Sequence, residues 1–195
     1  MVSVRHAVLF AAVWALVGAQ PVEAEPKYEL ASPKDLPGLK NFAQVSPGLY
    51  RSAQPTRKGF KRAKKLGIKT VVSLRTFHSD RDELEGLGLN YARISFKPWH
   101  AEDEDVVKFL QIATNPDYQP VLVHCKHGAD RTGTMVALYR VYEQGWPKKV
   151  ALKELPRFGF HKVWANLKRY FRKVNIESLR EQVERAKQPK VDLVR

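Results

Sequence analysis

The stretch that decides the fold lies at residues 121–133 and reads Val121-Leu122-Val123-His124-Cys125-Lys126-His127-Gly128-Ala129-Asp130-Arg131-Thr132-Gly133. Its first three residues are apolar, which predicts a short buried strand. The residues from Thr132 to Gln144 predict a helix, which Gly145 and Pro147 end. A strand, a tight loop and a helix in this order direct backbone N–H groups and the positive end of the helix dipole at an anion. Residues 124–133, called the Cys125 loop below, are therefore predicted to hold a phosphate group.

Two side chains of the Cys125 loop can act on one phosphate group. Cys125 lies near its start and Arg131 follows six residues later. A guanidinium binds phosphate through two charge-assisted hydrogen bonds, and positive surroundings favour a thiolate over a thiol. Cys125 is therefore the candidate nucleophile and Arg131 the candidate phosphate ligand. We expect His124 to support the loop through hydrogen bonds and Thr132 to donate its hydroxyl to the sulfur.

The pattern His-Cys-x-x-Gly-x-x-Arg-Thr-Gly in this loop resembles the signature of the protein tyrosine phosphatase superfamily. Leu49–Pro55 and Val71–Arg75 resemble segments of the small atypical dual-specificity phosphatases of bacteria, plants and fungi, and similarity covers about residues 45 to 170. Plant and fungal members include enzymes acting on inositol pyrophosphates. The resemblance implies the cysteine-phosphatase fold and the hydrolysis of phosphomonoesters through a phosphocysteine intermediate on Cys125.

The remaining loop residues complete the candidate substrate-binding set. Gly128 removes side-chain bulk where the backbone wraps around the anion, and Gly133 allows close packing of the helix. Lys126 is similar to a lysine of tensin-related phosphoinositide phosphatases that supports binding of further phosphates, but Lys126 and His127 can equally be solvated. Ala129 completes the set. No His, Asp or Glu cluster has clear metal-ligand spacing in the sequence, so we expect neither a metal nor a cofactor.

The leaving oxygen needs a proton, and the sequence offers two places for its donor. The resemblance implies an Asp on a loop upstream of the nucleophile, and Asp103 and Asp105 lie in the corresponding segment, Lys97–Asp105. These acids also open a predicted helix, where negative charge is favoured in any case. Asp130 resembles the loop Asp of myotubularin-like and Sac-type phosphatases, and its alternative role is a structural ion pair. Both places stay open.

Strands alternate with helices along the chain, which predicts an α/β fold with a central, mostly parallel sheet flanked by helices. The expected strands lie at residues 48–52, 68–74, 90–96 and 121–123. The expected helices lie at residues 56–65, 80–87, 102–113, 132–144, 148–155, 161–173 and 176–187. The helical C-terminal part is expected to pack on the same sheet.

The predicted phosphatase domain covers residues 45–187. Residues 25–44 contain three prolines among polar residues and predict an extended lead-in. Residues 188–195 are expected to form a flexible tail.

The first residues, 1–24, have the pattern of a signal peptide. A short basic start precedes an apolar run, Ala7–Ala19, and small residues allow cleavage near Ala19 or Ala24. The run is too short to span a bilayer comfortably, so an uncleaved anchor is only the alternative. We therefore expect a protein exported to the periplasm or secreted, without stable membrane insertion after cleavage.

The net charge of the chain indicates which kind of partner it attracts. The chain has 34 Lys and Arg against 20 Asp and Glu, a net charge of +14, and such a surface attracts anions. The expected substrate is a phosphorylated protein, at tyrosine, serine or threonine, or a polyphosphorylated small molecule such as an inositol polyphosphate; no nucleic acid is expected. The alternative of another class is a non-catalytic phosphate-binding module, against which both Cys125 and Arg131 count.

Overall fold

The computed structural model describes residues 28–195, so the predicted signal peptide lies outside the described residues. Strands in this part form a seven-stranded sheet in the order β1-β2-β3-β6-β4-β5-β7. Their bounds are Lys34–Leu36 (β1), Leu39–Ser46 (β2), Leu49–Ser52 (β3), Thr70–Ser73 (β4), Leu89–Arg93 (β5), Val121–His124 (β6) and Asp192–Val194 (β7). The central strands β3, β6, β4 and β5 are parallel, and the outer strands pair antiparallel. The predicted α/β fold is confirmed.

The register of β6 positions the Cys125 loop. β6 lies between β3 and β4, and His124 at its end is level with both Ser52 and Ser73. Because parallel strands end at the same edge of a sheet, the loop that follows β6 is flanked by the segments that follow β3 and β4. Residues far apart in the sequence can therefore contact this loop.

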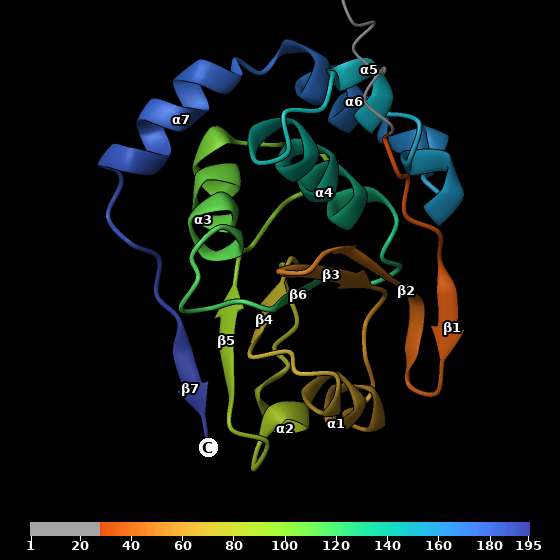
Figure 1. Ribbon diagram of the computed structural model, residues 1–195, viewed down its shortest axis with the longest axis vertical. Coiled ribbons are helices and arrows are strands. Elements are labelled where there is room, and N and C mark those ends of the chain that lie inside the picture. Colours follow the sequence, from red (N-terminus) through yellow and green to blue (C-terminus); the bar gives the residue numbers. More distant parts are fainter. Residues whose placement is uncertain (1–27) are drawn as a thin grey trace, which may run out of the picture.

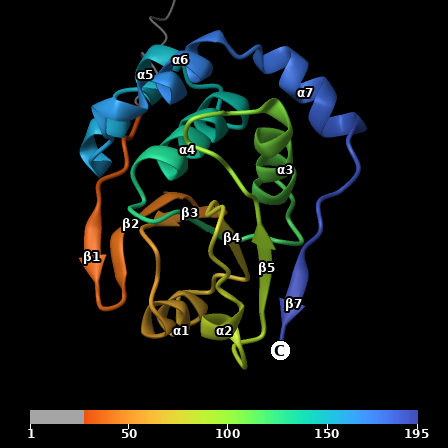
Figure 2. The ribbon, with the colours of Figure 1, turned by 180° about the vertical axis from the view of Figure 1, so that it is seen from behind.

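Helices cover both faces of the sheet. Their bounds are Arg57–Lys65 (α1), Arg81–Leu84 (α2), Asp103–Ala113 (α3), Asp130–Tyr142 (α4), Lys148–Ala151 (α5), Ala165–Lys173 (α6) and Ile176–Arg185 (α7), with 3₁₀ turns at Leu155–Phe158 and Lys162–Trp164. α1 and α2 lie on one side of the sheet, and α3 and α4 lie on the other, beneath an outer layer of α5, α6 and α7 (Figures 1 and 2). Helix α1 begins as predicted, because Thr56 accepts a hydrogen bond from the Gly59 N–H.

The core continues on both sides of β6. Val121 and Val123 belong to the cluster that includes side chains of α3 and α4, whereas Leu122 packs with Ala63 of α1 on the opposite face. All four of these side chains are fully buried. A parallel strand that is covered on both faces reads as a continuous apolar run, which is why the sequence predicts it correctly.

The N-terminal segment differs from the expected extended lead-in. β1 and β2 form a hairpin whose β2 strand pairs with β3, so this segment belongs to the sheet. Gly38 in the turn has φ +84°, and a Cβ there would lie 2.4 Å from the backbone nitrogen of Gly59. Leu39 and Phe42 are buried. The nearby prolines suggested an extended segment outside the domain. For the residues of β1 and β2 that prediction was wrong.

The C-terminal segment also differs from the expected flexible tail. β7 pairs antiparallel with β5, with Val194 opposite Leu89. Val194 is buried, and Asp192 forms an ion pair with Arg81 at the start of α2. β7 has only three residues and begins with a polar one, so its sequence alone does not predict a strand. Its pairing depends on the contacts with β5 and with Arg81.

The helical C-terminal part was predicted to pack on the sheet, but its helices pack mainly on other helices. α6 contacts α4 and α7 contacts α3, and Leu167, Phe171 and Leu179 are buried in the same cluster as the inner helices. Within the described residues, no helix combines the length and apolar character that crossing a membrane requires.

Candidate active site

The Cys125 loop lies tightly against strand β3. Gly128 has φ +68°, and a Cβ there would lie 2.5 Å from the nitrogen of Ala53 and 2.6 Å from the carbonyl oxygen of Ser52. Gln54 extends this contact by donating its backbone N–H to the carbonyl of Lys126 at 3.2 Å. Because backbone atoms cannot give way, only glycine fits at position 128.

The start of α4 is packed in the same way. Ala129 is buried and immediately precedes the helix. At Gly133 a Cβ would lie 2.8 Å from Cδ2 of Leu155. The helix that follows the loop is therefore held close to the 3₁₀ turn at Leu155–Phe158.

A buried charged network supports the first residue of the loop. His124 is fully buried, and its Nε2 lies 3.0 Å from Oδ2 of Asp80. Asp80 also accepts a 2.6 Å hydrogen bond from Gln54, which in turn accepts one from Arg75 at 3.0 Å. Burial by itself raises the pKa of Asp80, but the hydrogen bonds from His124 and Gln54 outweigh it and lower this pKa to about 2. A carboxylate thus fixes the His124 ring, whereas Nδ1 of His124 has no hydrogen-bond partner among the described residues.

A second buried network holds the middle of the loop. Arg51 in β3 donates a 2.8 Å hydrogen bond to the carbonyl of Gly128 and pairs with Glu154 at 3.4 Å. Glu154 also pairs with Arg140 of α4 at 2.8 Å. Burial lowers the pKa of Arg51 to about 10, against the opposing negative charge of Glu154. The loop is therefore attached to β3 and α4 through charged side chains.

Cys125 and Arg131, the side chains predicted for chemistry, lie near the two ends of this loop. The thiol of Cys125 is free, and the residue is only 2% exposed. Arg131 is half-buried, and its Nη1 donates a 3.1 Å hydrogen bond to the carbonyl of Leu74, which directly follows β4. Among the described residues, the buried hydroxyl of Thr132 has no hydrogen-bond partner, so its predicted bond to the sulfur is not formed here. An unpaired buried hydroxyl costs free energy, so a hydrogen-bond partner for the Thr132 hydroxyl would be favourable.

The exposed side of the loop borders a basic pocket. Lys126 and His127 are exposed, and they line a pocket of about 750 Å³ together with Lys34 and Lys40 of the β1–β2 hairpin. Asn41 in the same hairpin donates a 3.0 Å hydrogen bond to the carbonyl of His127. The hairpin thus brings two further lysines to the loop.

The two upstream acids differ in their surroundings. Asp103 accepts a 2.7 Å hydrogen bond from the hydroxyl of Tyr170, and burial together with this carboxylate raises the pKa of Tyr170. Asp105 is half-buried, and burial raises its own pKa above the ordinary value for Asp. A raised pKa favours the protonated form of Asp105 relative to an ordinary Asp. Within residues 28–195, neither acid is hydrogen bonded to the Cys125 loop.

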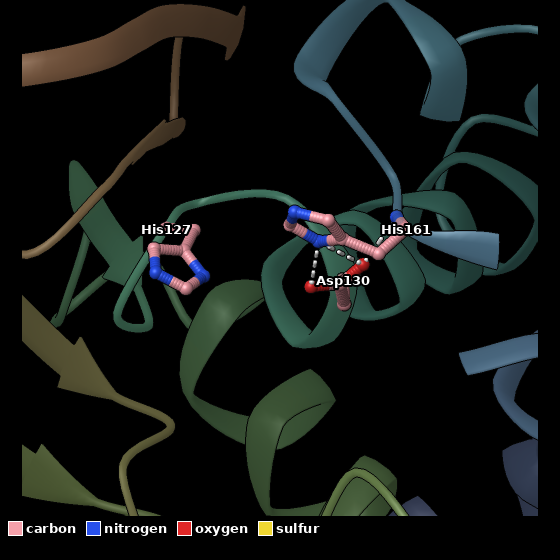
Figure 3. Close-up of side chains that lie close together, drawn as sticks. All are labelled: His127, Asp130 and His161. Atoms are coloured by element: carbon pink, nitrogen blue, oxygen red, sulfur yellow. Dashed lines mark hydrogen bonds and ion pairs between the residues drawn. The ribbon is translucent and has the colours of Figure 1, made fainter. Parts of the chain in front are cut away.

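Asp130 is engaged by a residue from a distant segment. Its Oδ1 accepts a 2.7 Å hydrogen bond from the backbone N–H of His161, and Nδ1 of His161 lies 2.9 Å from Oδ2 (Figure 3). Asp130 is buried whereas His161 is exposed. Both carboxylate oxygens are thus directed at His161, which fits the structural alternative for Asp130.

The model of the tyrosine phosphatase family matches residues 38–192. The chain belongs to this family. The dual specificity protein phosphatase TpbA of Pseudomonas aeruginosa (strain UCBPP-PA14) is 42% identical over 124 residues, which are 62% of this chain and 55% of that protein. The inositol diphosphatase SIW14 of Saccharomyces cerevisiae is 29% identical over 135 residues, 65% of this chain and 48% of that protein. The chain thus spans about half the length of these curated relatives.

The fold of this tyrosine phosphatase family member also resembles that of a solved structure of TpbA. The crystal structure of P. aeruginosa TpbA in complex with pTyr has a TM-score of 0.70 and 30% identity, and the match covers 80% of this chain and 98% of that one.

Sequence reasoning missed the supporting residues of this family member. Asp80, Glu154 and His161 lie 44, 103 and 31 residues from their partners His124, Arg51 and Asp130. No local pattern marks such distant pairs. Arg51 alone carried a signal, because a charged residue inside a short, otherwise buried strand needs a buried partner.

Proposed function

We propose that this tyrosine phosphatase family member hydrolyses phosphomonoesters, with Cys125 as the nucleophile. The observation that carries the proposal is the complete Cys125 loop, anchored by Asp80 below its first residue and by Arg51 at Gly128. An anion-binding loop has to keep its backbone N–H groups directed inward before the anion arrives, and two buried charged networks supply that preorganisation. A non-catalytic phosphate-binding module would not need the free thiol of Cys125.

The chemistry follows from the groups present. The Cys125 thiolate attacks phosphorus and the bond from phosphorus to the ester oxygen breaks, while Arg131 and the loop N–H groups neutralise the phosphoryl oxygens. The leaving oxygen takes a proton from a general acid, for which Asp105 is the preferred candidate. Water then attacks the phosphocysteine, the phosphorus–sulfur bond breaks, and phosphate leaves. The unpaired Thr132 hydroxyl can donate a hydrogen bond to the departing thiolate.

The first substrate class is a phosphorylated residue of a protein. Its support is the likeness to TpbA, which is named a dual specificity protein phosphatase and has been crystallised with pTyr. A buried nucleophile at the base of a loop suits a substrate whose phosphate reaches inward on a long side chain.

A polyphosphorylated small molecule is the second substrate class, and one structural observation favours it. Lys34, Lys40 and Lys126 line the pocket beside the loop, together with a single acid, Asp35, and these lysines could bind phosphate groups that do not react. The net charge of +14 acts in the same direction. The relative named inositol diphosphatase agrees with this class.

One substrate panel tests both classes. Phosphotyrosine, phosphoserine and phosphothreonine peptides and inositol polyphosphates are compared at matched ionic strength, with Cys125→Ser as the inactive reference. Substantial hydrolysis by Cys125→Ser would falsify the nucleophile assignment.

Variants of the pocket then separate the classes. If the hairpin lysines bind substrate phosphates, Lys34→Ala and Lys40→Ala raise KM for inositol polyphosphates and leave KM for a phosphotyrosine peptide nearly unchanged. Lys61→Ala is the matched control, because Lys61 is an exposed lysine of α1 outside the pocket. Equal KM changes for all three variants would mean that the lysines act only through overall charge.

We further propose that the chain is exported, on the basis of the apolar run Ala7–Ala19 and the small residues after it. N-terminal sequencing of the protein from an exporting host tests this. A mature chain that begins at Gln20 or Glu25 supports export with cleavage, and an intact Met1 in the cytoplasmic fraction contradicts it.

A further inference from the structure

Three side chains with metal-binding atoms lie together beside the Cys125 loop (Figure 3). They are His127 within the loop, Asp130 in the first turn of α4, and His161 in the segment before α6. Each offers one ligand atom, and these atoms all lie within 4.8 Å of one another. Sequence spacing could not indicate this group, because His161 is distant in the chain.

The arrangement is close to the geometry of a metal centre. Zinc binds His nitrogen and carboxylate oxygen at about 2.0 to 2.2 Å, so tetrahedral ligand atoms lie roughly 3.3 Å apart. Nδ1 of His161 is already 2.9 Å from Oδ2 of Asp130. The widest pair would have to close by no more than about 1.5 Å. Rotation of the two exposed histidines can supply this movement, since the His161 side chain is 51% exposed.

The chemical types match one class of ion. Two imidazoles and one carboxylate suit zinc and neighbouring divalent transition metals, and three protein ligands leave further positions open for water or an anion. When Nδ1 of His161 takes the metal, its proton moves to Nε2 and the ring stays neutral. Asp130 then keeps its link to His161 through the ion in place of the hydrogen bond.

The two histidine rings are also favourably placed relative to each other. Their centroids lie 5.7 Å apart at an interplanar angle of 61°, so no ring has to leave its position entirely.

The charge environment opposes a cation, because Lys126 and Arg131 are close in the chain and Asp130 supplies only one negative charge. We therefore expect reversible binding rather than a permanently occupied structural site.

A second cluster with similar spacing is a poorer candidate. His78, Asp80 and Glu83 also offer three ligand atoms within the same limit. Asp80, however, is fully buried and already bonded to both His124 and Gln54. A cation there would break the network beneath the Cys125 loop, whereas the first cluster would exchange only one hydrogen bond.

We propose that His127, Asp130 and His161 form a binding site for one divalent cation of the zinc class. The site does not depend on the proposed function, because the ligands and their geometry are independent of turnover. Its test is therefore a measurement of binding rather than of activity.

The experiment titrates zinc into the reduced, metal-free full chain in competition with a chromophoric chelator. We expect one zinc per chain, with affinity at least tenfold lower in His127→Ala and in His161→Ala. His100→Ala is the matched control, because His100 is an exposed histidine paired with Glu102, and its affinity should equal that of the unchanged protein. Circular dichroism verifies that each variant is folded, and His127→Ala, an exposed position, provides a folded test if His161→Ala fails.

Cys125 is the main competing ligand, and Cys125→Ser distinguishes it. Retained zinc affinity in this variant supports the proposed site, and loss of binding overturns it in favour of a thiolate-bound ion. Cobalt(II) gives an independent readout, because a cobalt–thiolate bond produces an intense near-ultraviolet band. Absence of that band with visible bands of a low-coordinate nitrogen and oxygen site supports the proposal. Absence of binding, or binding that survives both His variants, overturns it.

Discussion

Nε2 of His124 lies 3.0 Å from Oδ2 of Asp80, and neither side chain has any exposed surface. This pair lies where the Cys125 loop leaves the sheet, because His124 is both the last residue of β6 and the neighbour of the candidate nucleophile. The free energy of unfolding and the chemistry of the loop should therefore respond together when the pair is broken.

We expect Asp80→Asn to lower the free energy of unfolding at neutral pH by about 1 to 3 kcal/mol, because buried His124 loses a charged acceptor. Turnover should fall as well, since the loop loses its support. Chemical denaturation and steady-state kinetics measure the two effects. Asp82→Asn, at an exposed position of α2, is the control and should change neither quantity.

The same pair predicts a pH dependence. The pKa of Asp80 is lowered from 3.8 to about 2 in the folded protein, so the ionised carboxylate stabilises the fold above its ordinary pKa. This contribution is lost as the pH falls from about 4 towards 2. The difference in unfolding free energy between the unchanged protein and Asp80→Asn should therefore shrink over that range. A constant difference would contradict the role given to the charge.

Arg51 and Arg140 share Glu154 but only Arg51 contacts the Cys125 loop. Removing one partner of a buried ion pair costs about 3 to 5 kcal/mol, and the remaining partner of Glu154 should hold the loss to the lower end. We expect Arg51→Met and Arg140→Met to be destabilised to a similar extent. Only Arg51→Met should also weaken inhibition by vanadate, an analogue of bound phosphate. Equal vanadate affinities in the two variants would show that the contact with Gly128 does not shape the loop.

The proton donor is found by comparing two leaving groups. An acid matters most when the departing oxygen is strongly basic, so its replacement slows an alkyl phosphate far more than a nitrophenyl phosphate. We expect this pattern for Asp105→Asn, because Asp105 lies in the upstream segment and burial raises its pKa, which favours the protonated form. Asp103→Asn should chiefly lower stability through Tyr170.

Asp130→Asn provides the opposing test. Its carboxylate is bonded to His161, so we expect both substrates to be slowed alike through altered loop geometry. If Asp130→Asn alone shows the leaving-group-dependent loss, the upstream assignment is wrong. If none of the three variants shows it, the proton comes from water or from a substrate phosphate.

The rate at which a reagent modifies Cys125 should fall as the size of the reagent increases. Cys125 is 2% exposed, so hydrogen peroxide should inactivate the protein while a bulky maleimide reacts slowly. External thiol should restore activity as long as oxidation has stopped at the sulfenic stage, and phosphate should protect. Because the chain has only one Cys, intact-mass spectrometry assigns every adduct. Maleimide labelling as fast as in denaturant would mean that the thiol is freely accessible.

Local patterns in the sequence were sufficient for the central elements. The run Val121–Val123, the Thr56 cap and the acids that open α3 each act within a few residues, and the structure has a strand or helix at each of these places. The loop motif is equally local, because a backbone that wraps around one anion needs its glycine and arginine at set spacings.

Tertiary structure alone decided what holds the loop and closes the sheet. The β1–β2 hairpin and β7 join the sheet by pairing with the outer edges of β3 and β5, which local sequence does not show. Asp80, Arg51 and His161 acquire their roles through partners that lie far away in the chain. A buried charge is tolerated only beside its partner, and that partner is known only after the chain has folded.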